Sequence, residues 1–272
     1  MPTAEEIKER LLDENSGLRE SIVRDIGTST VALFAIIDSS AGELLRFCGT
    51  GSLVQFANSH CILTTAHVWE ECLKHSQRVG ITLKENVDHR CPIDTAALVR
   101  FGLPVPQHWN EWGPDLMFLR IPHNLVGGIE AFKRFYPLDR ELPKEKGDRI
   151  EVSILMGAPG EFGKYTPTHA ELNINGFFSD VNAGPYKHGE FDYVDLKEDM
   201  TFPGIPKDFG GVSGGGLWRV QVFGTPDDAE IKRRWSLEGV AFFQIPVANS
   251  QMVLRCHGPE SIHIAMKMVP EV

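Results

Sequence analysis

Most apolar residues of the chain fall in short runs separated by glycine, proline and polar turns. The first clear run, Val31–Ile37, ends at a polar turn over residues 38–42. Runs of this kind predict strands, and many short strands between turns predict an all-β sandwich or barrel. The expected strands form two sets, 31–37, 45–56, 61–65, 79–83, 96–101 and 116–121, then 149–155, 170–174, 191–196, 216–223, 236–244 and 252–256.

Both ends of the chain show a helical pattern instead. Thr3 and Glu6 have the spacing of a capping box, which predicts the start of a helix. A partial apolar stripe follows at Ile7, Leu11, Leu18, Ile22, Val23 and Ile26. The break at residues 15–17 predicts two helices, and residues 259–268 predict a short C-terminal helix. We expect the N-terminal helices to pack on the outside of the main fold; a partner-binding segment is the alternative.

The length of 272 residues suits one large domain or two small barrels that share a core. A Pro- and Lys-rich tract at residues 141–146 is the best internal boundary. The sequence therefore predicts a helical extension over 1–27, a first half over 28–140 and a second half over 141–272.

Composition and charge narrow the possible partners. The chain is 42% hydrophobic and 24% charged, which is typical of a globular protein. Its formal net charge is −10, so we expect neither nucleic acid nor an anionic membrane surface as a partner. No apolar run approaches the length of a membrane span, and residues 1–6 lack the basic and apolar regions of a signal peptide.

The cysteines do not form a recognisable disulfide or metal pattern. There are five, with irregular spacing and no Cys-x-x-Cys: Cys48, Cys61, Cys72, Cys91 and Cys256. This predicts free thiols, with no intramolecular disulfide, and a reducing, cytoplasmic compartment.

The candidate chemistry begins with the stretch Asp208–Gly216, where five glycines surround Ser213. A glycine run is entropically costly to order, so an ordered one usually serves tight turns or close backbone approach. A serine on such a turn can project its hydroxyl while neighbouring N–H groups converge, which is the geometry of a nucleophile with an oxyanion hole. An ordinary Gly/Ser loop without chemistry is the other interpretation.

Two further stretches contain a histidine and an aspartate in comparable settings. His67 follows an apolar strand that ends in small residues, 64–66, which allow another backbone to approach. Asp115 precedes the apolar run Leu116–Ile121, where an acid is costly to bury unless it is hydrogen bonded. A histidine N–H would satisfy it. Taken singly, His67 could equally be a core histidine and Asp115 a surface aspartate.

Together the three stretches resemble the trypsin/chymotrypsin-like serine peptidase family. His67 lies in a Thr-Thr-Ala-His segment, Asp115 opens an apolar strand, and Ser213 lies in Gly-x-Ser-Gly-Gly. The order His, Asp, Ser is that of chymotrypsin. The spacings also suit the family, with 48 residues from His67 to Asp115 (115 − 67) and 98 from Asp115 to Ser213 (213 − 115).

The resemblance implies a fold and a set of roles. It implies two six-stranded antiparallel β-barrels, His67 and Asp115 in the first and Ser213 in the second. Ser213 would be the nucleophile, His67 the general base and acid, and Asp115 the group that orients the imidazole. The backbone N–H groups of Gly211 and Ser213 would form the oxyanion hole.

The resemblance also implies a substrate strand and no cofactor. Ala241, Phe242, Phe243 and Gln244 would bind the substrate backbone as an added strand. Neither a metal nor an organic cofactor is expected.

Two residues depart from the pattern of the secreted animal members. Val212 stands where those have an aspartate that pairs with a new N-terminus after cleavage, and Val68 stands where they have a cysteine. Both departures indicate bacterial-type, intracellular relatives and no activation by N-terminal cleavage. Lys207 lies six residues before Ser213, a position that could favour acidic substrate residues.

The sequence therefore predicts a serine endopeptidase that hydrolyses protein or peptide substrates through a Ser-His-Asp triad and an acyl-enzyme. One alternative is a catalytically silent module that holds a peptide in the cleft. Another is a protease that stays inactive until a protein partner remodels its glycine-rich loop.

Overall fold

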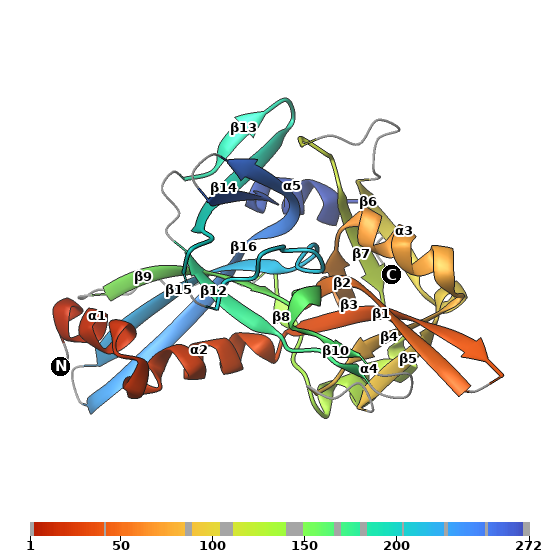
Figure 1. Cartoon of the computed structure of the whole chain (residues 1–272), viewed down its shortest axis with the longest axis horizontal. Coiled ribbons are helices and arrows are strands. Elements are labelled where there is room, and N and C mark those ends of the chain that lie inside the picture. The colour runs from red at the N-terminus through yellow and green to blue at the C-terminus, as the bar shows by residue number, and fades with distance from the viewer. Residues whose placement is uncertain are drawn as a thin grey trace.

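The computed structural model describes residues 3–40, 42–84, 89–103, 111–139, 149–165, 170–179, 184–202, 204–225, 228–247 and 250–268. The expected boundary tract at residues 141–146 lies outside them. Figure 1 shows two sheets, with the first half of the chain in red to yellow and the second in green to blue. None of the described helices is long and apolar enough to cross a membrane.

The first sheet is built around a long hairpin. Its strand order is β5-β4-β1-β2-β3-β7-β6, and β8 pairs in parallel with β2. β1 is buried over its first seven residues because its apolar run faces packed side chains on both sides. The strands are β1 (Thr30–Ser39), β2 (Gly42–Phe56), β3 (Ser59–Thr64), β4 (Arg78–Thr82), β5 (Arg90–Asp94), β6 (Val99–Leu103), β7 (Leu116–Arg120) and β8 (Tyr136–Pro137).

The second sheet is antiparallel with the order β12-β9-β15-β16-β17-β14-β13. A separate two-stranded ladder joins β10 and β11. The strands are β9 (Arg149–Gly157), β10 (Lys164–Tyr165), β11 (Ala170–Glu171), β12 (Asn175–Ser179), β13 (Tyr186–His188), β14 (Phe191–Asp199), β15 (Gly216–Thr225), β16 (Asp228–Val247) and β17 (Gln251–His257).

The strand count differs from the expectation of six strands in each barrel. The sheets have eight and seven strands, and among the described residues no pairing joins the two end strands of either sheet. The expected strand at 170–174 shortens to β11, and β12 forms directly after it. Two helices were also not expected, α3 (Ala66–His75) and α4 (His123–Glu130). Each buries only a few side chains, so its apolar stripe is too short to stand out in the sequence.

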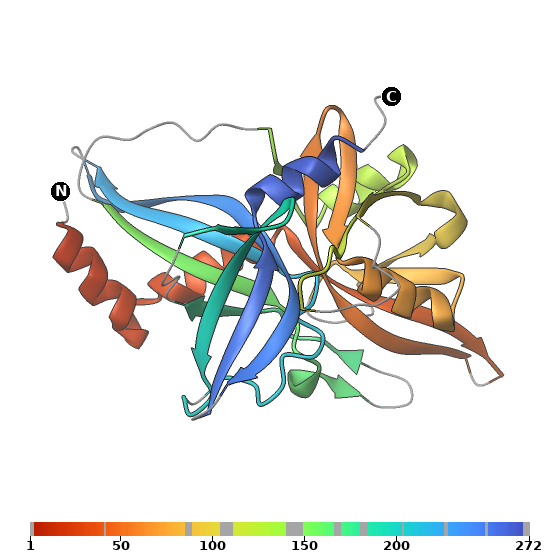
Figure 2. The same ribbon diagram turned by 90° about the horizontal axis from the view of Figure 1, so that it is seen from above.

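The N-terminal helices pack on the outside of the second sheet, as expected. The capping box forms: the Glu6 N–H donates to Thr3 Oγ1 at 3.3 Å and the Thr3 N–H to Glu6 Oε2 at 2.8 Å. The apolar stripes of α1 (Ala4–Leu12) and α2 (Leu18–Gly27) share one buried cluster with residues of β9 and β15. Figures 1 and 2 show both helices along these strands.

A C-terminal helix links the two sheets. α5 (Pro259–Met266) follows β17 and contacts β6 and β7 of the first sheet as well as β14 and β16 of the second. Figure 2 shows it lying across the junction. The residues that precede β7 are therefore held close to the end of β17.

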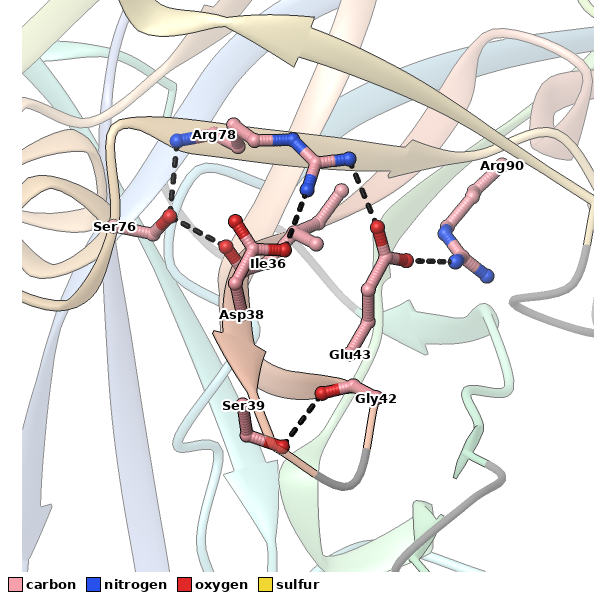
Figure 3. A network of polar contacts seen from close by, with 8 residues as sticks. All are labelled: Ile36, Asp38, Ser39, Gly42, Glu43, Ser76, Arg78 and Arg90. Atoms are coloured by element: carbon pink, nitrogen blue, oxygen red, sulfur yellow. Dashed lines mark hydrogen bonds and ion pairs between the residues drawn. The ribbon is translucent and has the colours of Figure 1, made fainter.

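A polar network ties the exposed end of the β1–β2 hairpin to β4 (Figure 3). Arg78 donates to Asp38 at 2.8 Å and to Glu43 at 2.9 Å, and Arg90 contacts the other oxygen of Glu43. These side chains are largely solvent-exposed, so each pair contributes at most about 1 kcal/mol. The network fixes the hairpin end, far from the residues considered next.

Candidate functional site

His67 is presented by the first turn of α3. β3 ends at Thr64, Thr65 is extended, and the helix begins at Ala66. Ala66, Val68, Trp69 and Cys72 are buried, so the helix is fixed against the first sheet. The His67 side chain stays 31% exposed. The rigid helix thus holds an imidazole that solvent can reach.

Asp115 lies directly before β7, and its side chain is fully buried. Oδ1 accepts a hydrogen bond from the His67 backbone N–H at 3.0 Å, and Oδ2 contacts His67 Nδ1. A buried carboxylate is tolerated only when hydrogen bonds replace its lost hydration. The two contacts provide them, and they fix both the position of the His67 backbone and the orientation of its ring.

His257, which the sequence did not single out, lies on the other side of Asp115. The Asp115 N–H donates to His257 Nε2 at 3.1 Å, so the proton of the neutral ring is on Nδ1. The ring is fully buried and stacks on Phe242, with centroids 4.2 Å apart. Burial lowers the pKa of His257 to about 4, although the charges of Asp115 and Asp192 act in the opposite direction. His257 is therefore neutral at pH 7 and positions the Asp115 backbone.

An aromatic stack holds the segment before Asp115. The Trp112 ring lies between the Arg255 guanidinium, 4.0 Å from its centroid, and the His188 ring, 3.9 Å away. Arg255 is anchored in turn by Asp195, at 2.9 Å. Arg255 and His188 belong to the second sheet. The second sheet therefore fixes the segment that leads into Asp115 and β7 of the first sheet.

A hydrogen bond at Gly210 sets the direction of the next amide in the glycine-rich loop. The Gly210 carbonyl accepts from the Gly160 N–H at 2.8 Å. In a trans peptide the C=O and N–H point in opposite directions, so the Gly211 N–H points away from Gly160. Gly211 has φ +93°, and a Cβ there would lie 2.8 Å from the Ala158 carbonyl oxygen. Glycine is therefore required at 211. Among the described residues, no hydrogen bond occupies the N–H of Gly211 or Ser213.

Thr50 connects this loop to the first sheet. Its hydroxyl donates to the Gly211 carbonyl at 2.7 Å and accepts from the Ala158 N–H at 3.0 Å. Its backbone N–H donates to the Ser213 carbonyl at 2.9 Å. One threonine of β2 thus fixes both sides of the serine loop.

Ser213 is brought to the region of His67 by close backbone packing. A Cβ at Gly49 would lie 2.6 Å from Val68 Cγ2 and 3.0 Å from the Ser213 carbonyl oxygen. A Cβ at Gly214 would overlap Thr64 Oγ1, three residues before His67. The structure therefore brings the three expected residues together, with Asp115 bound to His67 and the serine loop packed against the chain that flanks His67.

A pocket of about 270 Å³ opens beside Ser213. Its lining is mostly apolar: Phe209, Gly210, Val212, Ser213, Ala241, Phe242, Phe243, Gln244 and Leu254. Lys207 is not among these residues, and its side chain is exposed while its N–H donates to Glu161 at 2.7 Å. None of the described lining residues carries a charge, so Lys207 does not give the pocket a preference for acidic substrate side chains.

Gln244, which lines the pocket, and Asp208, which does not, are joined by a hydrogen bond. The Gln244 amide accepts from the Phe209 N–H at 3.2 Å and donates to Asp208 at 2.9 Å. Asp208 also accepts from the Gly210 N–H at 2.8 Å. The side chains of Gln244 and Asp208 thus hold the start of the glycine-rich loop.

The backbone of Ala241, the first residue of the expected substrate strand, is bound to the glycine-rich loop. The Ala241 N–H donates to the Gly215 carbonyl at 2.9 Å, and its carbonyl accepts from the Gly214 N–H at 2.8 Å. The Ala241 backbone is thus engaged by the loop, although the residue lines the pocket. β15 pairs with β16 only as far as Val240, whereas β17 pairs with β16 from Val240 to Val247.

Val212 packs as its apolar character predicts. It is 2% exposed within a cluster that includes Leu155, Phe177 and Leu217. A Cβ at Gly157 would lie 2.8 Å from Val212 Cγ1, so β9 approaches the loop closely. The loop is thus ordered by apolar packing at the position where the resemblance would place a buried aspartate.

Metal-ligating side chains are not gathered anywhere in the described chain: no group of three or more His, Cys, Asp or Glu could hold an ion.

Comparison with known proteins gives only a distant likeness. No family model and no curated protein matches the chain. One solved structure comes from work on aromatic interactions in the coupled folding and binding of the intrinsically disordered Sesbania mosaic virus VPg protein. The match covers 90% of this chain and 91% of the chain in that structure, with 13% sequence identity and a TM-score of 0.44. Neither family nor function follows from a likeness this distant.

Proposed function

We propose that this chain is a serine endopeptidase of the trypsin/chymotrypsin type, with Ser213, His67 and Asp115 as its catalytic residues. The observation that carries the proposal is the fully buried Asp115 carboxylate, bound to both the backbone N–H and the ring Nδ1 of His67. A buried acid in this arrangement leaves Nε2 of the imidazole as the site that accepts a proton. The proposal includes closure of the two sheets into the paired barrels of that family.

The first chemical step is acylation. Ser213 Oγ attacks the scissile carbonyl carbon while His67 Nε2 takes the hydroxyl proton. Asp115 stabilises the imidazolium and keeps the ring in the required tautomer. The oxyanion accepts hydrogen bonds from the unoccupied N–H groups of Gly211 and Ser213. Collapse expels the amine, which takes its proton from His67, and an acyl-enzyme remains.

The second step is deacylation. Water attacks the ester carbon and gives a proton to His67 Nε2. The bond from the acyl carbon to Ser213 Oγ then breaks, His67 returns the proton to Oγ, and the carboxylic acid product leaves.

The pocket supports a substrate with an uncharged, mainly apolar side chain before the scissile bond. Its lining has no charged residue in the described chain, and burying an unpaired charge there would be costly. The edge of β16 from Phe242 onward would pair with the substrate backbone.

Labelling with a fluorophosphonate tests this function. We expect the full chain to gain one phosphonyl group at Ser213, located by peptide mass spectrometry, and Ser213→Ala to gain none. A catalytically silent peptide-binding module, or a loop that needs a partner, would leave the wild-type chain unlabelled and would contradict the proposal.

A further inference from the structure

Two thiols face each other where the His67 helix meets the first sheet. In the β1–β2 ladder Phe47 pairs with Phe34 and Gly49 pairs with Leu33, so Cys48 is the extra residue of a β-bulge. A bulge redirects a side chain out of the regular alternation of the strand. Cys48 is half-buried and packs against the apolar cluster that contains α3.

Cys72 reaches the same place from the helix. Val68 and Cys72 are four residues apart on α3 and therefore share one helix face. Val68 lies against Gly49, since a Cβ at Gly49 would come within 2.6 Å of it. Cys72 is fully buried, and the Gly49–Val68 contact and the Arg46–Glu71 ion pair join the strand at Cys48 to the helix turn that ends at Cys72.

The two thiols have different chemical characters. Interaction with the neighbouring Cys72 thiol lowers the pKa of Cys48, and the Arg46 charge acts in the same direction. Interaction with Cys48, together with burial, raises the pKa of Cys72. Arg46 also pairs with Glu71 of α3 at 3.3 Å, across the same junction. The more exposed thiol is thus the better nucleophile, and the buried one is its neighbour.

We propose that Cys48 and Cys72 form a reversible disulfide when the protein meets a peroxide. The Cys48 thiolate attacks the peroxide O–O bond, gives a sulfenic acid, and releases water or an alcohol. The Cys72 thiol then attacks the Cys48 sulfur, an S–S bond forms, and the hydroxyl leaves with the Cys72 proton as water. The two thiols are oxidised by two electrons and the peroxide is reduced by two.

The bridge would join β2 to the helix that carries His67. It closes the chain between residues 48 and 72, which removes freedom from the unfolded state. Cys91 is also half-buried at this cluster, but it lies on β5 and its thiol pKa is raised by burial, so it serves as a matched control. The proposal does not depend on the peptidase activity.

The test treats the full chain with hydrogen peroxide, blocks remaining thiols with an alkylating reagent, and maps peptides by non-reducing mass spectrometry. We expect a Cys48–Cys72 cross-linked pair that dithiothreitol reverses, and a melting temperature raised by about 5–10 °C. Cys91→Ser should behave like the wild type. Cys48→Ser, at a half-exposed site that tolerates the change, should show neither the cross-link nor the shift.

Three results would overturn the proposal. The first is that Cys72 is recovered in alkylated form while Cys48 is oxidised to the sulfinic acid. The second is a cross-link that joins any other pair of cysteines. The third is a melting temperature that rises as much in Cys48→Ser as in the wild type.

Discussion

Asp115 has the most constrained surroundings of any residue in the site. Its carboxylate is bound to His67 on one side, and its backbone N–H is bound to His257 on the other. Burial excludes water from both contacts. A change of this one side chain therefore alters the histidine directly.

Asp115→Asn is expected to lower kcat by about 10⁴ at neutral pH, because an amide in this position favours the wrong histidine tautomer. Steady-state hydrolysis of a peptide substrate measures the effect, with the melting temperature as a check on folding. An unchanged rate would mean that another carboxylate orients His67.

His257 makes the stability of the fold depend on pH. Its pKa is about 4 in the folded protein and 6.5 in an ordinary histidine, so the unfolded chain binds more protons between these values. Stability is fully present above pH 6.5 and falls as the pH drops toward 4, by about 3 kcal/mol from this residue. Below pH 4 both states are protonated and the loss ends.

In His257→Gln the side-chain oxygen can accept a hydrogen bond from the Asp115 N–H, but the side chain has no titratable group. Denaturant unfolding at pH 7.5 and pH 4.5 should show that the variant loses about 3 kcal/mol less than the wild type on acidification. Asp115 and Asp192 are the charges that face the ring. Equal losses in the two proteins would contradict this account.

At the scale of elements, the glycine-rich loop is held from three directions. Thr50 of β2, Gly160 of the turn after β9 and Ala241 of β16 all hydrogen-bond to it. The Gly160 contact fixes the peptide between Gly210 and Gly211 and turns the Gly211 N–H away from Gly160. Order in the loop comes from its neighbours, because glycines supply little order themselves.

Gly211→Ala is expected to lower kcat by about 10²–10³, the typical effect of losing one oxyanion donor. The new Cβ would overlap Phe47 and meet the Ala158 carbonyl, so the amide must move. Gly189→Ala is the matched control: its φ is also positive, at +63°, but nothing lies within 4 Å of the added carbon. Similar decreases of kcat in both variants would contradict a specific role for the Gly211 amide.

At the scale of the whole molecule, activation should not require N-terminal cleavage. In cleavage-activated peptidases of the family that the sequence resembles, a freed ammonium pairs with a buried aspartate, whereas Val212 is packed among apolar side chains here. The chain that begins at Met1 should hydrolyse peptides with its intact mass unchanged before and after the assay. Activity that appears only with a shortened N-terminus would contradict the prediction.

The sequence predicted the residues that carry their own local signals. His67, Asp115 and Ser213 stand beside characteristic neighbours, and the capping box at Thr3 identified the first helix. His257 and Thr50 could not be identified, because their roles arise only when distant strands pair, as where His257 lies opposite Val240. The backbone contacts of Ala241 were missed for the same reason, since they depend on how the glycine loop folds back on β16.

The most direct test of the central claim compares peptide hydrolysis by the full chain and by Ser213→Ala. The substitution removes one hydroxyl, so we expect an unchanged melting temperature and a kcat lower by about 10⁶. Near-normal hydrolysis by the folded Ser213→Ala variant would show that Ser213 is not the nucleophile and would contradict the account.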